Sequence, residues 1–199
     1  MYETDSLIAR DSQLIRTDDM IEMRNHFSLF SFTLNHLDEP LSESLIKQMH
    51  SVLKRGTSDE TDPNYNVGDY KLTVNQIGFL NPIHVTSPED TPLEMKRLLD
   101  RYNTKQTTSL QDIFSFHVSF ERIHPFSDGN GRLGRMIMFR ECLIHHITPF
   151  IISDKNQSDY LRGLREQDDS PGYLTDTCLS EQDAFKELVT HYLRIALPQ

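Results

Sequence analysis

Apolar residues recur at helical spacing along most of the chain, and proline, glycine and polar clusters separate the segments that carry them. Thr17 supplies a capping hydroxyl and precedes two acids in a first turn, where the helix dipole favours negative charge. Ser42 caps a second helix, and Pro92 lies at the start of a third, where proline is tolerated. Helices are therefore expected over residues 17–37, 42–55, 91–102, 109–123, 133–143, 157–167 and 181–196.

Residues 109–123 differ from the other helical segments because apolar side chains occur on nearly every face. Such a helix is typical of the centre of a protein rather than its surface. The segment leads directly into His124, so this residue is expected at the end of a buried helix. The apolar positions are Leu110, Ile113, Phe114, Phe116, Val118, Phe120 and Ile123.

A short strand pair is expected between two of the helices. Residues 70–79 alternate in polarity and are rich in Thr, Val and Ile. A turn at 80–82 would bring residues 83–85 back alongside them. Because two short strands cannot form a free-standing sheet, this hairpin must lie on a helical body. The predicted fold class is all-α, with one helical domain over residues 1–199 that carries a small β-hairpin.

The charge balance narrows the possible partners. The chain has a net charge of −10 and a pI of about 5.3, which disfavours nucleic acid as a partner.

No apolar run approaches the roughly 20 residues of a membrane-spanning helix. The first residues lack an apolar signal core, which favours the cytoplasm. Cys142 and Cys178 form no C-x-x-C pair and are expected to be reduced and unpaired. The oligomeric state does not follow from these patterns.

One stretch after the central helix concentrates groups that bind phosphate. Residues 124–135 read His-Pro-Phe-Ser-Asp-Gly-Asn-Gly-Arg-Leu-Gly-Arg. The glycines of residues 129–131 let backbone N–H groups approach a ligand, and the N-terminus of the next helix favours an anion. Arg132 and Arg135 lie three positions apart, and their guanidinium groups suit phosphate oxygens. The stretch therefore predicts a phosphate-binding turn.

Two further residues of the stretch suit phosphate transfer. Asp128 could hold Mg²⁺, which takes carboxylates together with substrate phosphates. His124 could take a proton near neutral pH. Each group also has an ordinary alternative role. The arginines could form surface ion pairs, Asp-Gly could form a turn, and the histidine could lie at the surface or be hydrogen-bonded in the core. Their concentration in one stretch favours a functional site.

The same residues resemble the signature of the Fic family, H-x-F-x-[DE]-G-N-G-R-x-x-R, at every specified position. Residues 67–71 with 77–78 also resemble the strand that leads into the family's flap. Residues 148–152 with 160–164 resemble the connector and helix after the motif. The resemblance covers roughly residues 40–167, and the outer helices fit more loosely. It implies a Fic-type helical bundle with a β-hairpin flap beside the active site.

The resemblance implies an enzyme that transfers AMP from ATP to a Tyr, Thr or Ser hydroxyl of a target protein, or of itself, and releases pyrophosphate. His124 would deprotonate the hydroxyl, and Asp128 would hold Mg²⁺ between the α- and β-phosphates. Arg132 and Arg135 would hold the β- and γ-phosphates. The nucleotide-binding residues implied are Asp128, Gly129, Asn130, Gly131, Arg132, Leu133, Gly134, Arg135 and, near the base, Tyr160.

The hairpin would serve as the flap, where a target segment pairs in a strand-like manner. This pairing would align a target hydroxyl with His124. The docking residues implied are Asn75, Gln76, Ile77 and Gly78. Ordinary core packing is the alternative for Tyr160.

Many family members are inhibited by a helix with [ST]-x-x-x-E-[GN], whose Glu pairs with the second motif arginine, here Arg135. No Glu-Gly or Glu-Asn pair occurs in this chain. Glu22 is the candidate, although Asp18 stands where Ser or Thr belongs and Met23 follows it. The alternatives are an unrestrained enzyme and a partner that supplies the Glu.

Three other functions compete with AMP transfer. The site could transfer another nucleotidyl or phosphoryl group, but Gly129 favours AMP because the family's kinases and phosphocholine transferases depart from G-N-G at this glycine. The chain could bind nucleotide or protein without turnover, but a silent copy would be free to lose His124. The stretch could also be a structural junction between helices.

Overall fold

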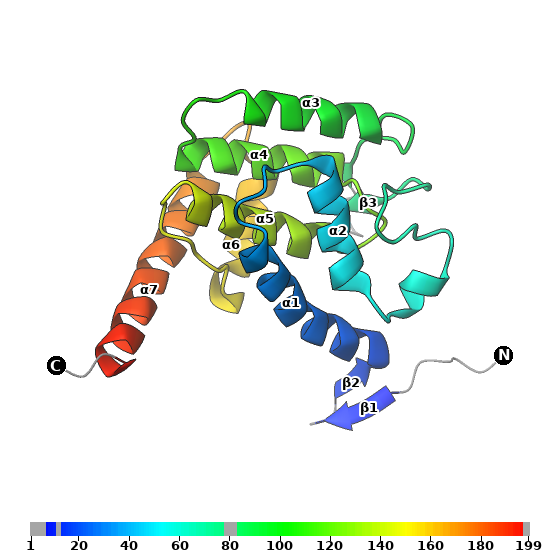
Figure 1. The fold of residues 1–199 in the computed structure, drawn as a ribbon, viewed down its shortest axis with the longest axis horizontal. Helices are drawn as coiled ribbons and strands as arrows, with labels where there is room; N and C mark the ends of the chain where they lie inside the picture. The colour runs from blue at the N-terminus through cyan, green and yellow to red at the C-terminus, as the bar shows by residue number, and fades with distance from the viewer. Residues whose placement is uncertain (1–6, 11–12, 78–82, 197–199) are drawn as a thin grey trace. The chain divides into compact units, whose positions relative to one another are not determined.

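The computed structural model of the protein describes residues 7–10, 13–77 and 83–196 (Figure 1). The all-α prediction is confirmed, because helices make up most of the described chain. The α-helices are α1 (Thr17–Asn35), α2 (Glu43–Lys54), α3 (Thr91–Asn103), α4 (Leu110–Ile123), α5 (Asn130–Ile144), α6 (Gln157–Arg165) and α7 (Gly172–Ala196). Two 3-10 helices are η1 (Ser58–Thr61) and η2 (Asp154–Asn156). No helix in the described part of the chain is long and apolar enough to cross a membrane.

Two antiparallel strand pairs accompany the helices. The strands are β1 (Leu7–Arg10) paired with β2 (Gln13–Arg16), and β3 (Gln76–Ile77) paired with β4 (Ile83–His84). The second pair is the predicted hairpin, shortened to two residues in each strand. The first pair is a new finding, since no element is expected before residue 17. Gly78 and the hairpin turn lie outside the described residues.

Side chains cap both ends of α2. The Ser42 hydroxyl accepts a hydrogen bond from the Leu45 N–H at 3.2 Å, as its predicted capping role requires. At the other end, the Asn25 amide nitrogen donates to the carbonyls of Leu53 at 3.0 Å and Arg55 at 2.7 Å. The last carbonyls of a helix have no partner within it, so these two bonds fix α1 against the end of α2.

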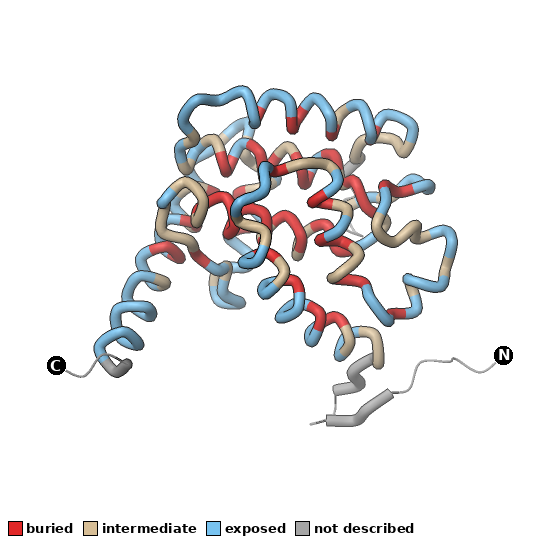
Figure 2. Tube along the Cα trace, in the orientation of Figure 1, coloured by how far each residue is buried: buried red, intermediate tan, exposed pale blue. Residues whose placement is uncertain are grey.

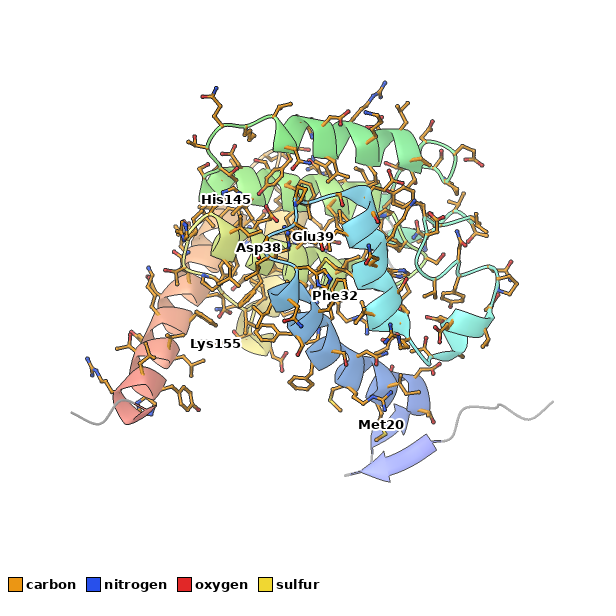
Figure 3. The ribbon with its side chains drawn as sticks, in the orientation of Figure 1. Met20, Phe32, Asp38, Glu39, His145 and Lys155 are labelled. Atoms are coloured by element: carbon orange, nitrogen blue, oxygen red, sulfur yellow. The ribbon has the colours of Figure 1, made fainter. Side chains whose placement is uncertain are left out.

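The helix α1 buries polar residues and exposes apolar ones. Met23 and Phe27 are exposed, and Figure 3 shows Met20 in the first turns of the helix and Phe32 towards its end. The buried residues are Glu22, Asn25, Leu29 and Thr33. Most apolar positions of residues 17–37 therefore do not lie on the buried face of the helix, and the Glu22 carboxylate enters the interior instead.

The chain divides into two compact units, one of residues 1–104 with 120–136 and one of residues 105–119 with 137–199. A single domain over residues 1–199 stays a prediction. In the first unit, α1 and α3 each pack against α2, and Figure 2 shows the buried positions along these helices. Its buried apolar residues include Leu29, Leu45, Ile46, Met49, Leu53, Met95, Leu98, Leu99, Phe120, Phe126 and Leu133.

In the second unit, α6 packs closely against α7. A Cβ atom at Gly163 would lie 2.6 Å from the Leu174 Cα, so only glycine fits at this approach. Cys142 and Cys178 are buried and free, as predicted, and burial raises the pKa of each thiol to about 12. The last turns of α7 are exposed, as Figure 2 shows.

Candidate active site

The helix α4 ends in a sharp change of direction at His124. The His124 N–H still donates to the Phe120 carbonyl at 2.9 Å, as in a helix. Its φ of 51° then turns the backbone into the left-handed region. Phe126 follows as a buried anchor, with its ring stacked on His50 at a centroid distance of 4.0 Å. The buried helix predicted from the sequence thus delivers His124 to a turn held by an aromatic contact.

Asn130 holds the turn that follows. Its Oδ1 accepts a hydrogen bond from the Phe126 N–H at 2.9 Å, and its Nδ2 donates to the Phe126 carbonyl at 2.7 Å. Gly129 has a φ of +81°, and a Cβ there would lie 3.1 Å from Leu53 Cδ2. The turn leads into the first N–H groups of α5, which favour an anion.

The ring of His124 is oriented by the helix before it. Its Nδ1 lies 3.3 Å from the Glu121 carbonyl, which can only accept, so Nδ1 carries the proton and donates. Burial, with a smaller contribution from the Lys71 ammonium, lowers the pKa of His124 to about 4, while the hydrogen bond to the Glu121 carbonyl and the Asp128 charge oppose this shift. Nε2 therefore presents a lone pair at neutral pH.

A carboxylate of the same α4 turn lies beside His124. The Glu121 Oε2 is 4.0 Å from His124 Nδ1. Burial raises the pKa of Glu121 to about 7, and Arg135 partly opposes that shift. Glu121 is thus poised between its neutral and charged forms where it faces the imidazole.

Asp128 belongs to a cluster of charges around the buried ammonium of Lys54. The Lys54 ammonium contacts the carboxylates of Asp128, Glu22 and Asp59, the last two at 2.5 Å each. Arg132 contacts Glu22 through Nη1 and lies 3.2 Å from Asp128 through Nη2. Burial of Asp128 disfavours its charge, but Lys54 and Arg132 hold the pKa of its carboxyl below the usual range. Asp128 is therefore ionised and ready to take a cation.

The donor set around Asp128 suits a hard divalent cation. Oxygen atoms of Glu22, Asp59 and Asp128 all lie within 4.8 Å of one another, and carboxylate oxygens are the ligands that Mg²⁺ prefers. The Asp128 side chain is half-exposed, so it is open to a ligand from outside. The Lys54 ammonium already contacts all three carboxylates, so a magnesium ion would be held at the exposed Asp128 and would share that carboxylate with Lys54.

Comparison with known proteins assigns the chain to a family. Residues 40–142 match the Fic/DOC family, which is more than half of the 199 residues and includes the whole turn at 124–135. The chain belongs to the Fic/DOC family. The resemblance noted in the sequence is confirmed.

Relatives and solved structures agree with this assignment. The protein adenylyltransferase Fic of Drosophila grimshawi is 28% identical over 134 residues, covering 63% of this chain and 27% of that protein. The chain spans about a quarter or less of the length of such curated relatives. A Fic family protein from Desulfovibrio desulfuricans G20 has a TM-score of 0.70 and 26% identity, covering 88% of this chain and 55% of that one. A Fic-domain signalling protein from Bacteroides thetaiotaomicron has a TM-score of 0.68 and 25% identity, with 88% and 67% covered.

The base of the hairpin predicted as the flap is tied to the motif. Asn75 donates its Nδ2 to the Phe126 carbonyl at 2.8 Å. Gln76 and Ile77 form β3 directly after it, and Gly78 lies outside the described residues. The structure thus brings the start of the predicted docking segment to the backbone beside His124, and its docking role stays a prediction.

Besides the buried turn residues Gly129 and Asn130, three residues implied as nucleotide contacts lie in the protein interior. Tyr160 is 1% exposed in the core of the second unit, and its hydroxyl is 2.5 Å from His117 Nε2. Leu133 and Gly134 are buried in α5. These positions favour packing, and a nucleotide contact at each stays a prediction.

Glu22 reaches the Fic motif by a different route from the one implied. It pairs with Arg132, the first motif arginine, instead of Arg135. The charge of Arg135 acts on His26 and Glu121, and a Cβ at Gly131 would lie 3.3 Å from the Arg135 Nη1. The candidate Glu is therefore in the site, but on the neighbouring guanidinium.

Sequence reasoning missed three buried polar residues around the motif. Lys54 and His50 lie on the buried face of α2 at helical spacing with Leu45, Ile46, Met49 and Leu53. Gly68 N–H donates to His50 Nδ1 at 3.0 Å, so Nε2 donates to the Asp128 carbonyl at 3.1 Å. The third is Lys71, 2% exposed. Polar residues that interrupt an apolar face were the available signal.

Proposed function

We propose that this Fic protein transfers AMP from ATP to the hydroxyl of a Tyr, Thr or Ser residue of a target protein. The relatives named as protein adenylyltransferases support this reaction class. The observation that carries the proposal is the pairing of a base with a charged carboxylate in one turn. The imidazole of His124 is unprotonated, and four residues later the Asp128 carboxylate contacts Lys54 and Arg132. The cytoplasmic location expected from the sequence belongs to the same proposal.

The reaction is an in-line displacement at the α-phosphorus. The target hydroxyl oxygen forms a bond to the α-phosphorus, and the bond from that phosphorus to the oxygen bridging to the β-phosphate breaks. Pyrophosphate leaves with the electron pair, and the hydroxyl proton passes to Nε2 of His124. Because burial keeps this nitrogen unprotonated at neutral pH, it can act as the general base.

The remaining motif residues position phosphate and stabilise its charge. Backbone N–H groups of residues 129–131, at the start of α5, bind phosphate oxygens. Arg132 and Arg135 bind the β- and γ-phosphates and stabilise the charge of the departing pyrophosphate. Asp128 would hold Mg²⁺, which would supply positive charge to neutralise the phosphates. In phosphoryl transfer, such positioning and charge stabilisation supply most of the catalysis.

Glu22 restrains this site in the same proposal. Its carboxylate contacts the guanidinium of Arg132 and the ammonium of Lys54. A triphosphate that needs Arg132 must compete with Glu22 for it. We therefore assign Glu22 as the inhibitory residue, acting through the first motif arginine.

An isotope comparison tests the reaction. Purified protein with Mg²⁺ and a lysate should transfer label from ATP marked on the α-phosphate and none from ATP marked on the γ-phosphate. His124→Ala should abolish transfer and leave ATP binding intact. His191→Ala is the control, because His191 is exposed, and it should change neither transfer nor ATP binding. Transfer of the γ label would make the protein a kinase, and binding without any transfer would make it a nucleotide-binding module.

A further inference from the structure

The backbone of His124 is held in a conformation that a histidine rarely adopts. Its φ is 51°, and residues with a side chain are uncommon in this left-handed region. Such strain persists at a functional site only when surrounding contacts fix it. The contacts that hold the carbonyl groups around His124 therefore determine where its imidazole points.

One residue binds the backbone on both sides of His124. The Lys71 N–H donates to the Pro125 carbonyl at 2.9 Å. The Lys71 ammonium donates to the Ile123 carbonyl at 3.2 Å. Lys71 thus binds the carbonyl of the residue before His124 and the carbonyl of the residue after it, so its two hydrogen bonds span the turn that contains His124.

The same ammonium reaches the base of the flap. Lys71 Nζ donates to Asn75 Oδ1 at 2.7 Å, and Asn75 Nδ2 donates to the Phe126 carbonyl at 2.8 Å. The carbonyls of Ile123, Pro125 and Phe126, on both sides of His124, are held by this pair of side chains and by the Lys71 backbone. The strand β3 begins immediately after Asn75.

Lys71 is an unusual lysine because it is 2% exposed and no carboxylate in the described part of the chain forms an ion pair with it. Burial lowers the pKa of its ammonium to about 8. A buried ammonium without a counter-charge is costly, and a methionine of similar length would fill the same space. A methionine would lack the N–H donors of Lys71, which bind the Asn75 amide oxygen and the Ile123 carbonyl.

We infer that Lys71 is a positioning residue that holds the imidazole of His124 and the base of the flap as one hydrogen-bonded unit. Only the expected loss of AMP transfer rests on the proposed function, and the expected change in hydrogen exchange does not. A target segment that pairs with the flap is then aligned with the base through Asn75 and Lys71. Loss of the ammonium should misplace the base with little effect on ATP binding.

The test compares Lys71→Met, which keeps the length and removes the donors, with Lys71→Arg, which restores donors. Lys96→Met is the matched control, because Lys96 is exposed on α3 and pairs with Asp100 at 2.6 Å. Hydrogen exchange of segments 68–77 and 123–130 measures the positioning without any activity. The rate of AMP transfer and the KM for ATP measure its consequence.

In Lys71→Met, exchange in both segments should become faster by about tenfold or more, and kcat should fall by about tenfold or more with KM for ATP unchanged. Lys71→Arg should restore most of the slow exchange and most of kcat, and Lys96→Met should behave as the unaltered protein. Unchanged exchange in Lys71→Met overturns the inference, and so does a rise in KM that accounts for the loss of activity. If the unaltered protein transfers no AMP, the proposed function fails, and exchange alone decides on Lys71.

Discussion

The carboxylate of Glu22 lies 2.5 Å from the ammonium of Lys54, although 32 residues separate them in the sequence. The contact joins α1 to α2 inside the charge cluster that contains Asp128 and Arg132. A residue outside the Fic motif is thereby connected to both the Asp128 carboxylate and the first arginine of that motif.

Replacing Glu22 by glutamine should increase the rate of AMP transfer. The substitution keeps the shape of the side chain and removes the charge that holds Arg132, so a triphosphate no longer competes with it. An increase on the order of tenfold is expected, which is the usual size of coupling between two such ligands. Initial rates of label transfer measure it, with Glu94→Gln as the control, because Glu94 lies on α3 and pairs with the exposed Arg97. An unchanged rate removes Glu22 from the mechanism of restraint.

Replacing Lys54 by methionine should destabilise the protein and make its stability depend on divalent cations. Lys54 is 1% exposed among three carboxylates, and breaking such a buried pair costs about 3–5 kcal/mol. The carboxylates of Glu22, Asp59 and Asp128 would then repel one another unless a cation joins them.

Thermal unfolding with Mg²⁺ or Ca²⁺ and with a chelator measures this effect. The Tm of Lys54→Met should rise with the cation by more than the Tm of the unaltered protein. Equal shifts in the two proteins would show that the carboxylates do not act as a cation site when Lys54 is absent.

The stability of the protein should fall in acid partly through His50. Burial lowers the pKa of His50 to about 4, below the roughly 6.5 of an unfolded chain. The unfolded chain therefore binds the proton first, and the stability that neutral His50 contributes is complete above about pH 6.5 and falls as pH drops towards 4. The effect approaches about 2–3 kcal/mol.

Comparison with His50→Gln isolates this contribution. Glu121 acts in the opposite direction, because its raised pKa of about 7 reduces stability as pH rises, but it is present in both proteins. Urea unfolding between pH 4 and 8 should give His50→Gln the shallower slope below pH 6.5. Parallel curves for the two proteins would mean that His50 does not titrate in this range.

Replacing Gly163 by alanine should destabilise the second unit by about 2–3 kcal/mol. The new Cβ would lie 2.6 Å from the Leu174 Cα and 2.7 Å from its nitrogen, and backbone atoms cannot move aside without shifting α7. Gly172→Ala is the matched control, because nothing lies within 4 Å of its Cβ position. Equal melting temperatures for the two variants would contradict the close approach of α6 and α7.

Local signals predicted the helices well where a cap or a breaker marks their ends. Ser42 and Pro92 gave the starts of α2 and α3 to within a residue. The start of α7 was placed nine residues late, at 181 instead of Gly172, because polar residues dilute the apolar pattern there. Only tertiary burial of Leu174 and Cys178 reveals that the helix has already begun.

The motif at 124–135 could be read from the sequence because its residues are neighbours in the chain. The partners of Asp128 could not, because Lys54 lies 74 residues away and looks like any lysine on a helix. The same holds for Lys71, which bonds to a carbonyl 52 residues further on. Long-range pairing of charges depends on how helices pack, and a sequence pattern records only which side of each helix is apolar.

The double hydrogen bond between Asn130 and Phe126 gives the motif turn its shape without any ligand. A loop that must become ordered when it binds loses conformational entropy at that moment, and its affinity falls accordingly. In this chain the ordering belongs to folding itself. A variant at Asn130 would therefore weaken the proposed binding of ATP through disorder of this turn, even if the amide never touches a phosphate.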